Sequence, residues 1–182
     1  MPMPMPIDDS RLSRFDSLAD NTSSSATSQT SNSQDYSLLT QQLQTVIDDE
    51  TDTVANLANC AALLHQELAD ISWVGFYLLK HEQLVLGPFQ GATVSPRVAL
   101  GEAICGTAAL MRKAINVADV QQFPGYQARD SEARSEMVLP LWREGQLLGV
   151  LDITSTKVER FDFCDQQGLE RLMQQLVAQL AH

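Results

Sequence analysis

The chain has 182 residues, 44% of them hydrophobic, which is enough to bury one core but too few for two domains of ordinary size. Lys and Arg number 12 against 23 Asp and Glu, so the formal net charge is −11. A nucleic-acid backbone or an anionic membrane would repel such a chain. We therefore expect one folded domain whose partners are small molecules or proteins, with neither nucleic acid nor membrane among them.

The N-terminal region is predicted to be a disordered tail over residues 1–35. Residues 21–33 are almost entirely small and polar, so they offer too little apolar surface to offset the entropy lost on ordering. The start lacks the basic and apolar regions of a signal peptide, and no stretch of the chain approaches the roughly 20 apolar residues of a membrane helix. The expected compartment is the cytosol, and the folded domain is expected over residues 36–182.

Three segments have apolar residues at helical spacing. The first two cover residues 39–47 and 54–68, with Asp52 as the N-cap of the second. The third covers residues 169–180, and residues 162–165 supply an Asp at each end as its N-terminal cap. These patterns predict three amphipathic helices that pack on a common core.

Four short apolar runs predict two β-hairpins between these helices. Residues 73–79 and 84–86 flank a polar turn, and residues 137–142 and 147–153 flank the Glu-Gly pair at 144–145. Helices alternating with hairpins in this order predict an α+β domain with a mainly antiparallel sheet.

The three cysteines, Cys60, Cys105 and Cys164, are widely spaced and form no Cys-x-x-Cys pair, so neither a disulfide framework nor a zinc site is expected. Cys105 precedes a helix expected to begin at Gly106, where the helix dipole would lower the pKa of its thiol. The alternative is a buried, inert thiol. The three histidines fit neither a metal site nor a catalytic triad.

Two further features bear on function. Residues 119–136 are rich in polar and turn-forming residues and predict a long surface loop, which is either a binding segment or a solvated charged face. Asp152 lies within an apolar strand, so its carboxylate either points out of the core or lines a pocket with a partner.

Several ordered runs carry a resemblance to a known family, and they extend over about residues 36–180. They are SWVGFYLL at 72–79, LVLGPFQG at 84–91, CGTA at 105–108, FPG at 123–125, RSE at 134–136, GVLDI at 149–153 and RFD at 160–162. Together they resemble the free methionine-(R)-sulfoxide reductases, which are single GAF domains. The resemblance implies a six-stranded antiparallel sheet with helices on one face, a closed pocket on the other sized for one free amino acid, and a homodimer.

The resemblance also assigns roles to individual residues. Trp73 and Tyr77 correspond to the aromatic walls around the methyl sulfoxide, and Glu136 and Asp152 correspond to acids that hold the amino group and assist protonation of the sulfoxide oxygen. Arg129 stands where the family has its nucleophilic cysteine, and a guanidinium cannot attack sulfur. It could instead pair with a pocket carboxylate or receive an anionic group of a ligand.

Two other family positions are changed as well. Ser95 replaces a second cysteine and Thr154 replaces a further pocket aspartate, whereas Cys105 matches the one family cysteine that is retained. Sulfoxide reduction by this route needs a thiolate nucleophile, an acid, and a second thiol that converts the sulfenic acid to a disulfide.

Three functions follow from this pattern. The leading hypothesis is a catalytically degenerate member that binds a small amino-acid-like ligand, as a sensor domain does. The second is an active reductase in which Cys105 is the nucleophile and an external thioredoxin-type thiol resolves the intermediate, with no other cofactor. The third is a protein-interaction module with a vestigial pocket. Cavity geometry and the exposure of Cys105 distinguish them. A solvent-sized, acid-lined cavity with an exposed Cys105 favours the enzyme, and a cavity plugged by Arg129 favours the module. An open cavity with a buried Cys105 favours the binder.

Overall fold

The structure is a computed structural model that describes residues 35–126 and 132–180. The predicted N-terminal tail, except for its last residue, and Arg129 lie outside the described residues. The helices are α3 (Tyr36–Ile47), α4 (Thr53–Glu67), α5 (Ala103–Met111) and α6 (Phe163–Gln179), with a short 3-10 helix, η1 (Val120–Gln122). The strands are β1 (Trp73–Lys80), β2 (Gln83–Gln90), β3 (Arg97–Ala99), β4 (Ile115–Val117), β5 (Ser135–Arg143) and β6 (Gln146–Ser155).

The strands form one six-stranded antiparallel sheet in the order β3-β2-β1-β6-β5-β4. Both predicted hairpins are confirmed, since β1 pairs with β2 and β5 pairs with β6. Glu144 and Gly145 have φ values of 50° and 80°, the left-handed conformation that a two-residue hairpin turn requires. The central pairing of β1 with β6 joins the two hairpins into a single sheet.

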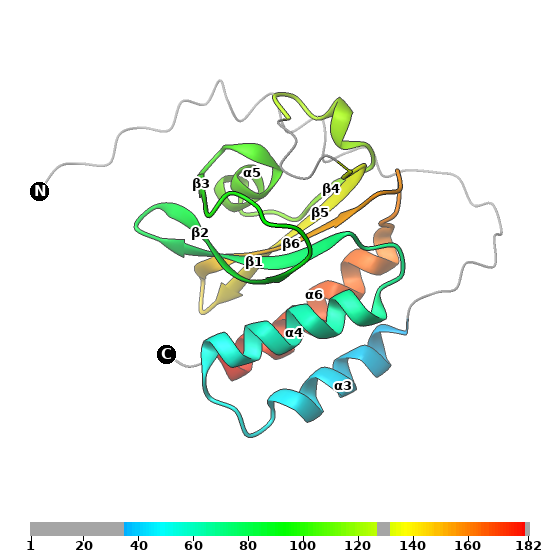
Figure 1. Ribbon diagram of the computed structural model, residues 1–182. Coiled ribbons are helices and arrows are strands. Elements are labelled where there is room, and N and C mark those ends of the chain that lie inside the picture. Colours follow the sequence, from blue (N-terminus) through cyan, green and yellow to red (C-terminus); the bar gives the residue numbers. More distant parts are fainter. Residues whose placement is uncertain (1–34, 127–131, 181–182) are drawn as a thin grey trace, which may run out of the picture. The chain divides into compact units, whose positions relative to one another are not determined.

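Helices α4 and α6 cover one face of the sheet, with α3 packed against them on the same side, and the shorter α5 lies on the opposite face (Figure 1). The α+β class, the six antiparallel strands and the helical layer on one face are confirmed. Alternate residues of the central strands enter the core beneath the helices, among them Phe76, Met137 and Leu151. The opposite face of the same strands is therefore available for a pocket beside α5.

Both capping sites expected from the sequence are found, at the starts of α4 and α6. The Asp52 side chain accepts a hydrogen bond from the Ala55 N–H at 2.9 Å, and Asp162 and Asp165 form a reciprocal capping box at the start of α6. The expected start at Gly106 is wrong, because α5 begins at Ala103. Cys105 is consequently inside the first turn of α5 rather than before it.

The segment predicted as one long surface loop, residues 119–136, is more ordered at both ends than expected. The 3-10 helix η1 occupies residues 120–122, and β5 already begins at Ser135. Phe123 and Ala133 are buried. These apolar side chains attach the two ends of the segment to the domain, so the loop is shorter than its polar composition indicated.

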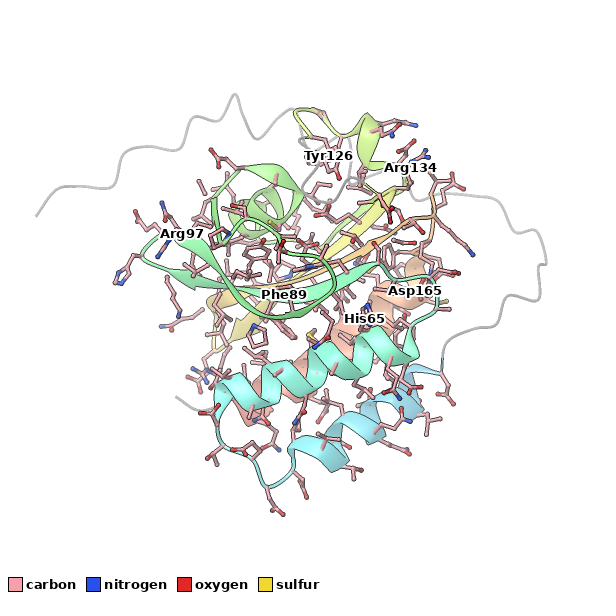
Figure 2. The ribbon with its side chains drawn as sticks, viewed as in Figure 1. His65, Phe89, Arg97, Tyr126, Arg134 and Asp165 are labelled. Atoms are coloured by element: carbon pink, nitrogen blue, oxygen red, sulfur yellow. The ribbon has the colours of Figure 1, made fainter. Side chains whose placement is uncertain are left out.

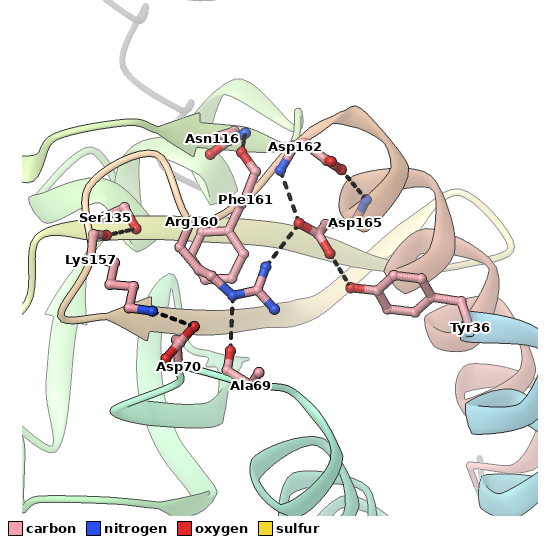
Figure 3. Close-up of polar contacts among 10 residues, drawn as sticks. All are labelled: Tyr36, Ala69, Asp70, Asn116, Ser135, Lys157, Arg160, Phe161, Asp162 and Asp165. Carbon is pink, nitrogen blue, oxygen red and sulfur yellow. Dashed lines mark hydrogen bonds and ion pairs between the residues drawn. The ribbon is translucent and has the colours of Figure 1, made fainter. Parts of the chain in front are cut away.

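A cluster centred on Asp165 joins the helices of this layer to one another (Figure 3). The Tyr36 hydroxyl donates to Asp165 Oδ1 at 2.6 Å, and Arg160 Nη1 donates to Asp165 Oδ2 at 3.1 Å. Arg160 Nε also donates to the Ala69 carbonyl at 2.8 Å, and the Asp162 N–H donates to Asp165 Oδ2 at 3.0 Å. The Asp165 cluster therefore ties α3, the end of α4 and the start of α6 to one another.

Candidate functional site

The sheet register brings the expected pocket residues together from three strands. Thr154 on β6 pairs with Trp73 on β1 and with Glu136 on β5. Residues paired across an antiparallel sheet lie on the same face, as do residues two apart along one strand. Tyr77 therefore lies on the face of Trp73, and Asp152 lies on the face of Thr154. This is the face opposite α3, α4 and α6.

A small cavity of about 20 Å³ lies between these side chains. It is lined by eight residues: Trp73, Tyr77, Val94, Tyr126, Ala133, Glu136, Asp152 and Thr154. All four of the described residues that the resemblance assigned to substrate binding are among them. The volume is close to that of one water molecule, and an amino acid is several times larger.

Two buried carboxylates give the cavity its acidic character. Glu136 is 2% exposed and Asp152 is 1% exposed. The two alternatives for Asp152 are thereby resolved, because its side chain lines the cavity and does not point into solvent. Burying a carboxylate costs folding free energy unless polar groups surround it. Buried carboxylates at a cavity are typical of a site that recognises a cation or donates a proton.

The aromatic residues of the cavity also hold the connection between β2 and β3. Trp73 Nε1 donates to the Ala92 carbonyl at 3.0 Å, and the Tyr77 hydroxyl donates to the Ser95 carbonyl at 2.9 Å. The Trp73 ring also stacks on Phe89, with the ring centroids 5.6 Å apart and the planes inclined by 19°. The Tyr77 hydroxyl hydrogen is therefore directed at the protein backbone in this structure.

Gly91 allows this connection to pass close to Trp73. Its φ is +119°, and a Cβ atom there would lie 2.7 Å from both the Ser72 carbonyl oxygen and Trp73 Cδ1. Any larger residue would push the connection away from the aromatic wall. The glycine at the end of the LVLGPFQG run is thus required by the packing of the site.

The cysteines lie apart from the cavity. None of the three forms a disulfide within the described residues: Cys60 and Cys105 are buried, and Cys164 is exposed. Burial raises the pKa of the Cys60 thiol. Within the described residues no thiol lines the cavity, and no group of His, Cys, Asp and Glu side chains has the arrangement of a metal site. The environment of Arg129 lies outside the described residues.

Three lining residues were missed by the sequence reasoning: Val94, Tyr126 and Ala133. Val94 and Ala133 belong to irregular segments, where no periodic pattern marks which side chains point inward. Tyr126 closes a turn that follows η1, and its N–H donates to the Phe123 carbonyl at 3.0 Å. Figure 2 labels its position. An aromatic residue directly after a Pro-Gly turn was the available signal for it.

Similarity to known proteins agrees with this geometry. The family model for the GAF domain matches residues 50–180. The chain is 45% identical over 149 residues to Protein YtsP of Bacillus subtilis, covering 81% of this chain and 91% of that protein. It is 44% identical over 146 residues to the free methionine-R-sulfoxide reductase of Escherichia coli, covering 80% of this chain and 88% of the enzyme.

Solved structures show the same relationship. The reduced form of fRMsr of Staphylococcus aureus is 42% identical with a TM-score of 0.80, covering 85% of this chain and all of that one. The free methionine-R-sulfoxide reductase of Neisseria meningitidis in complex with its substrate is 37% identical with a TM-score of 0.78, covering 86% and 94%. No helix within residues 35–126 and 132–180 has the length and apolar character to cross a membrane. The chain belongs to the GAF domain family, and its homologues include the free methionine-R-sulfoxide reductases.

Proposed function

We propose that this chain binds a small amino-acid-like ligand and is a catalytically degenerate relative of the free methionine-R-sulfoxide reductases. The observation that supports this most directly is the cavity itself, in which Glu136 and Asp152 lie with Trp73 and Tyr77 but no described thiol. The carboxylates complement the ammonium group of an amino acid, and the aromatic rings complement its apolar end. These groups serve recognition without a nucleophile.

The chemistry of sulfoxide reduction argues against an active enzyme. The covalent step needs a thiolate in contact with the sulfoxide sulfur. By the resemblance, Arg129 stands at the family position of that cysteine. Cys105 is fully buried and does not line the cavity. A thiol outside the cavity would have to move into it before any reaction with a bound ligand, and reacting atoms must be placed within about an ångström.

Ligand entry requires the pocket to widen, because about 20 Å³ does not hold an amino acid. The connection between β2 and β3 is the segment we expect to move, since its Val94 lines the cavity. This movement would break the hydrogen bonds from Trp73 and Tyr77 that hold the connection in place. The same small volume favours the alternative in which the chain is an interaction module with a vestigial pocket. Binding measurements distinguish the two functions.

The test combines calorimetry with a turnover assay, using free L-methionine-(R)-sulfoxide and dithiothreitol as the reductant. We expect binding without turnover. Asp152→Asn is expected to weaken binding by about tenfold or more, because a charge-assisted hydrogen bond to the ammonium group is lost. Glu144→Gln, an exposed change in the β5–β6 turn, is the matched control and should have no effect.

Two results would overturn the proposal. Turnover that Cys105→Ser abolishes would establish the enzyme, with an external thiol as reductant. An absence of both turnover and binding would favour the interaction module.

Restoring the missing thiols tests the pocket in another way. Arg129→Cys together with Ser95→Cys is expected to give measurable reductase activity, since the acids and aromatic residues around the ligand are retained. The rescue should be partial, because Thr154 replaces a carboxylate and general acid catalysis contributes about 10²- to 10⁴-fold in rate. Adding Thr154→Asp should increase the rate further. A triple variant that is folded but shows no turnover would indicate that the pocket has diverged from the family ligand.

We also propose that the protein is a cytosolic homodimer, as the family resemblance implies. Its free thiols suit a reducing compartment. Sedimentation equilibrium of the full chain tests the assembly, and a monomer at micromolar concentration would contradict it.

A further inference from the structure

A second, larger pocket lies at the edge of the sheet where β4 no longer pairs with β5, and it shares no residue with the cavity of the candidate site. Its volume is about 290 Å³, and we call it the β5–α6 groove. It is lined by Arg112, Ala114, Leu139, Pro140, Leu141, Trp142, Glu170, Met173, Gln174 and Val177. The size lies near the lower end of the range of small-molecule sites, which begins at about 300 Å³.

The sheet topology explains why the groove exists. The edge strand β4 pairs with only residues 136–138 of β5, so residues 139–143 have no strand partner on that side. Pro140 lies in this unpaired part, where the absence of its N–H costs no sheet hydrogen bond. The buried side chains Leu141 and Met173, from β5 and α6, form an apolar floor.

Arg112 supplies a positive charge beside this apolar floor. Arg112 caps α5 in the left-handed conformation, with φ of 56°, and its guanidinium lies 5.7 Å from the centre of the Trp142 ring. Among the described residues no carboxylate lies within ion-pair distance of Arg112. Because the guanidinium lies over the aromatic face, its edge remains available for a planar anion such as a carboxylate.

Glu170 is the opposing charge in the groove. Its Oε1 accepts a hydrogen bond from Gln166 Nε2 at 2.9 Å, one turn earlier on α6. A ligand with two negative charges would be repelled by this carboxylate, whereas a ligand with a single anionic end can direct it toward Arg112 and away from Glu170. The charges therefore favour a monoanion with an apolar body.

We propose that the β5–α6 groove binds an amphipathic monocarboxylate of medium chain length. Its carboxylate pairs with Arg112 beside Trp142, and its hydrocarbon chain covers Leu141 and Met173. The assignment is independent of the proposed amino-acid site, since the two pockets have no side chain in common.

The test titrates the full chain with sodium octanoate and follows tryptophan fluorescence. Trp142 is 36% exposed at the groove, while the other tryptophan, Trp73, is buried. For a ligand of about ten non-hydrogen atoms we expect a dissociation constant on the order of 0.1 to 1 mM. Arg112→Gln is expected to weaken octanoate binding about tenfold. Glu170→Gln is expected to strengthen it a few-fold, because a repulsive charge is removed.

Controls separate charge recognition from general apolar adsorption. Arg171→Gln removes a neighbouring exposed charge on α6 that does not line the groove, and it should leave octanoate binding unchanged. Binding of the neutral probe 1-octanol should be the same in Arg112→Gln and in the original protein. Circular dichroism should show equal folding of all variants.

The proposal is overturned if octanoate does not bind, or if Arg112→Gln and Arg171→Gln weaken it equally. It is also overturned if sedimentation shows a dimer that Arg112→Gln dissociates, because the groove would then be covered by a second copy of the chain.

Discussion

Replacing Asp165 with alanine should destabilise the domain far more than replacing Lys157, although both residues form a short ion pair (Figure 3). The side chains of the Arg160–Asp165 pair are 16% and 10% exposed, whereas those of Lys157 and Asp70 are 61% and 41% exposed. Water screens the Lys157–Asp70 pair and solvates either charge when its partner is removed, whereas it has little access to the Arg160–Asp165 pair. Burial, and not distance, sets the difference.

The magnitude follows from the groups that Asp165→Ala leaves without an acceptor. The Arg160 guanidinium, the Tyr36 hydroxyl and the Asp162 N–H all donate to this carboxylate. Removing one partner of a fully buried pair costs about 3–5 kcal/mol, and residual exposure lowers this to roughly 3 kcal/mol here. Lys157→Ala should cost less than about 1 kcal/mol. For a domain of this size, about 3 kcal/mol lowers the melting temperature by roughly 10 °C.

Urea unfolding of both variants, followed by circular dichroism, measures the two free energies of unfolding directly. Equal slopes against urea concentration would show that the comparison concerns the native state. If Asp165→Ala costs no more than Lys157→Ala, the cluster does not hold the helical layer. The RFD run at residues 160–162 would then need an explanation other than fold stability.

Three further predictions use the same structure. In the native protein iodoacetamide should modify the exposed Cys164 but not the buried Cys60 and Cys105, as measured by mass spectrometry. Rapid labelling of Cys105 would instead support the enzyme hypothesis. Burial raises the pKa of the Tyr36 hydroxyl, so above about pH 10 the unfolded state loses this proton while the native state keeps it. The free energy of unfolding should therefore fall above about pH 10, and Tyr36→Phe should reduce this fall in unfolding experiments at alkaline pH. Gly168→Ala places a Cβ against the Tyr36 ring and should cost about 1–3 kcal/mol in urea unfolding.

Most of the fold could be predicted from sequence because its signals are local and periodic. The hairpin at residues 144–145 combines apolar strands with a Glu-Gly turn, and α6 has both a capping box and an unbroken apolar stripe. The start of α5 was misplaced because that helix has no side-chain cap hydrogen bond at Glu102 and is buried over most of its length. A helix that is apolar on all sides gives no amphipathic pattern from which to read its ends.

The pockets were predictable only in part. The four strand residues assigned by resemblance do meet at one cavity, because register and alternation fix which residues share a face. Val94 and Tyr126 came from irregular connections, whose inward side chains depend on tertiary contacts. The β5–α6 groove was not predicted. It arises because β4 pairs with only residues 136–138 of the longer β5, and no local pattern encodes the relative length of two strands.

The aromatic residues of the cavity are weaker support for ligand binding than its acids. Trp73 and Tyr77 hold the β2–β3 connection through their hydrogen bonds to backbone carbonyls, so a chain with a vestigial pocket would also need them. Glu136 and Asp152 differ, because a buried carboxylate costs folding free energy that a neutral side chain avoids. Both carboxylates also line the cavity, where they would lie beside the ammonium group of a bound ligand. The two acids, more than the aromatic wall, therefore favour a binding site for a cationic group, and their replacement by amides is the most informative change.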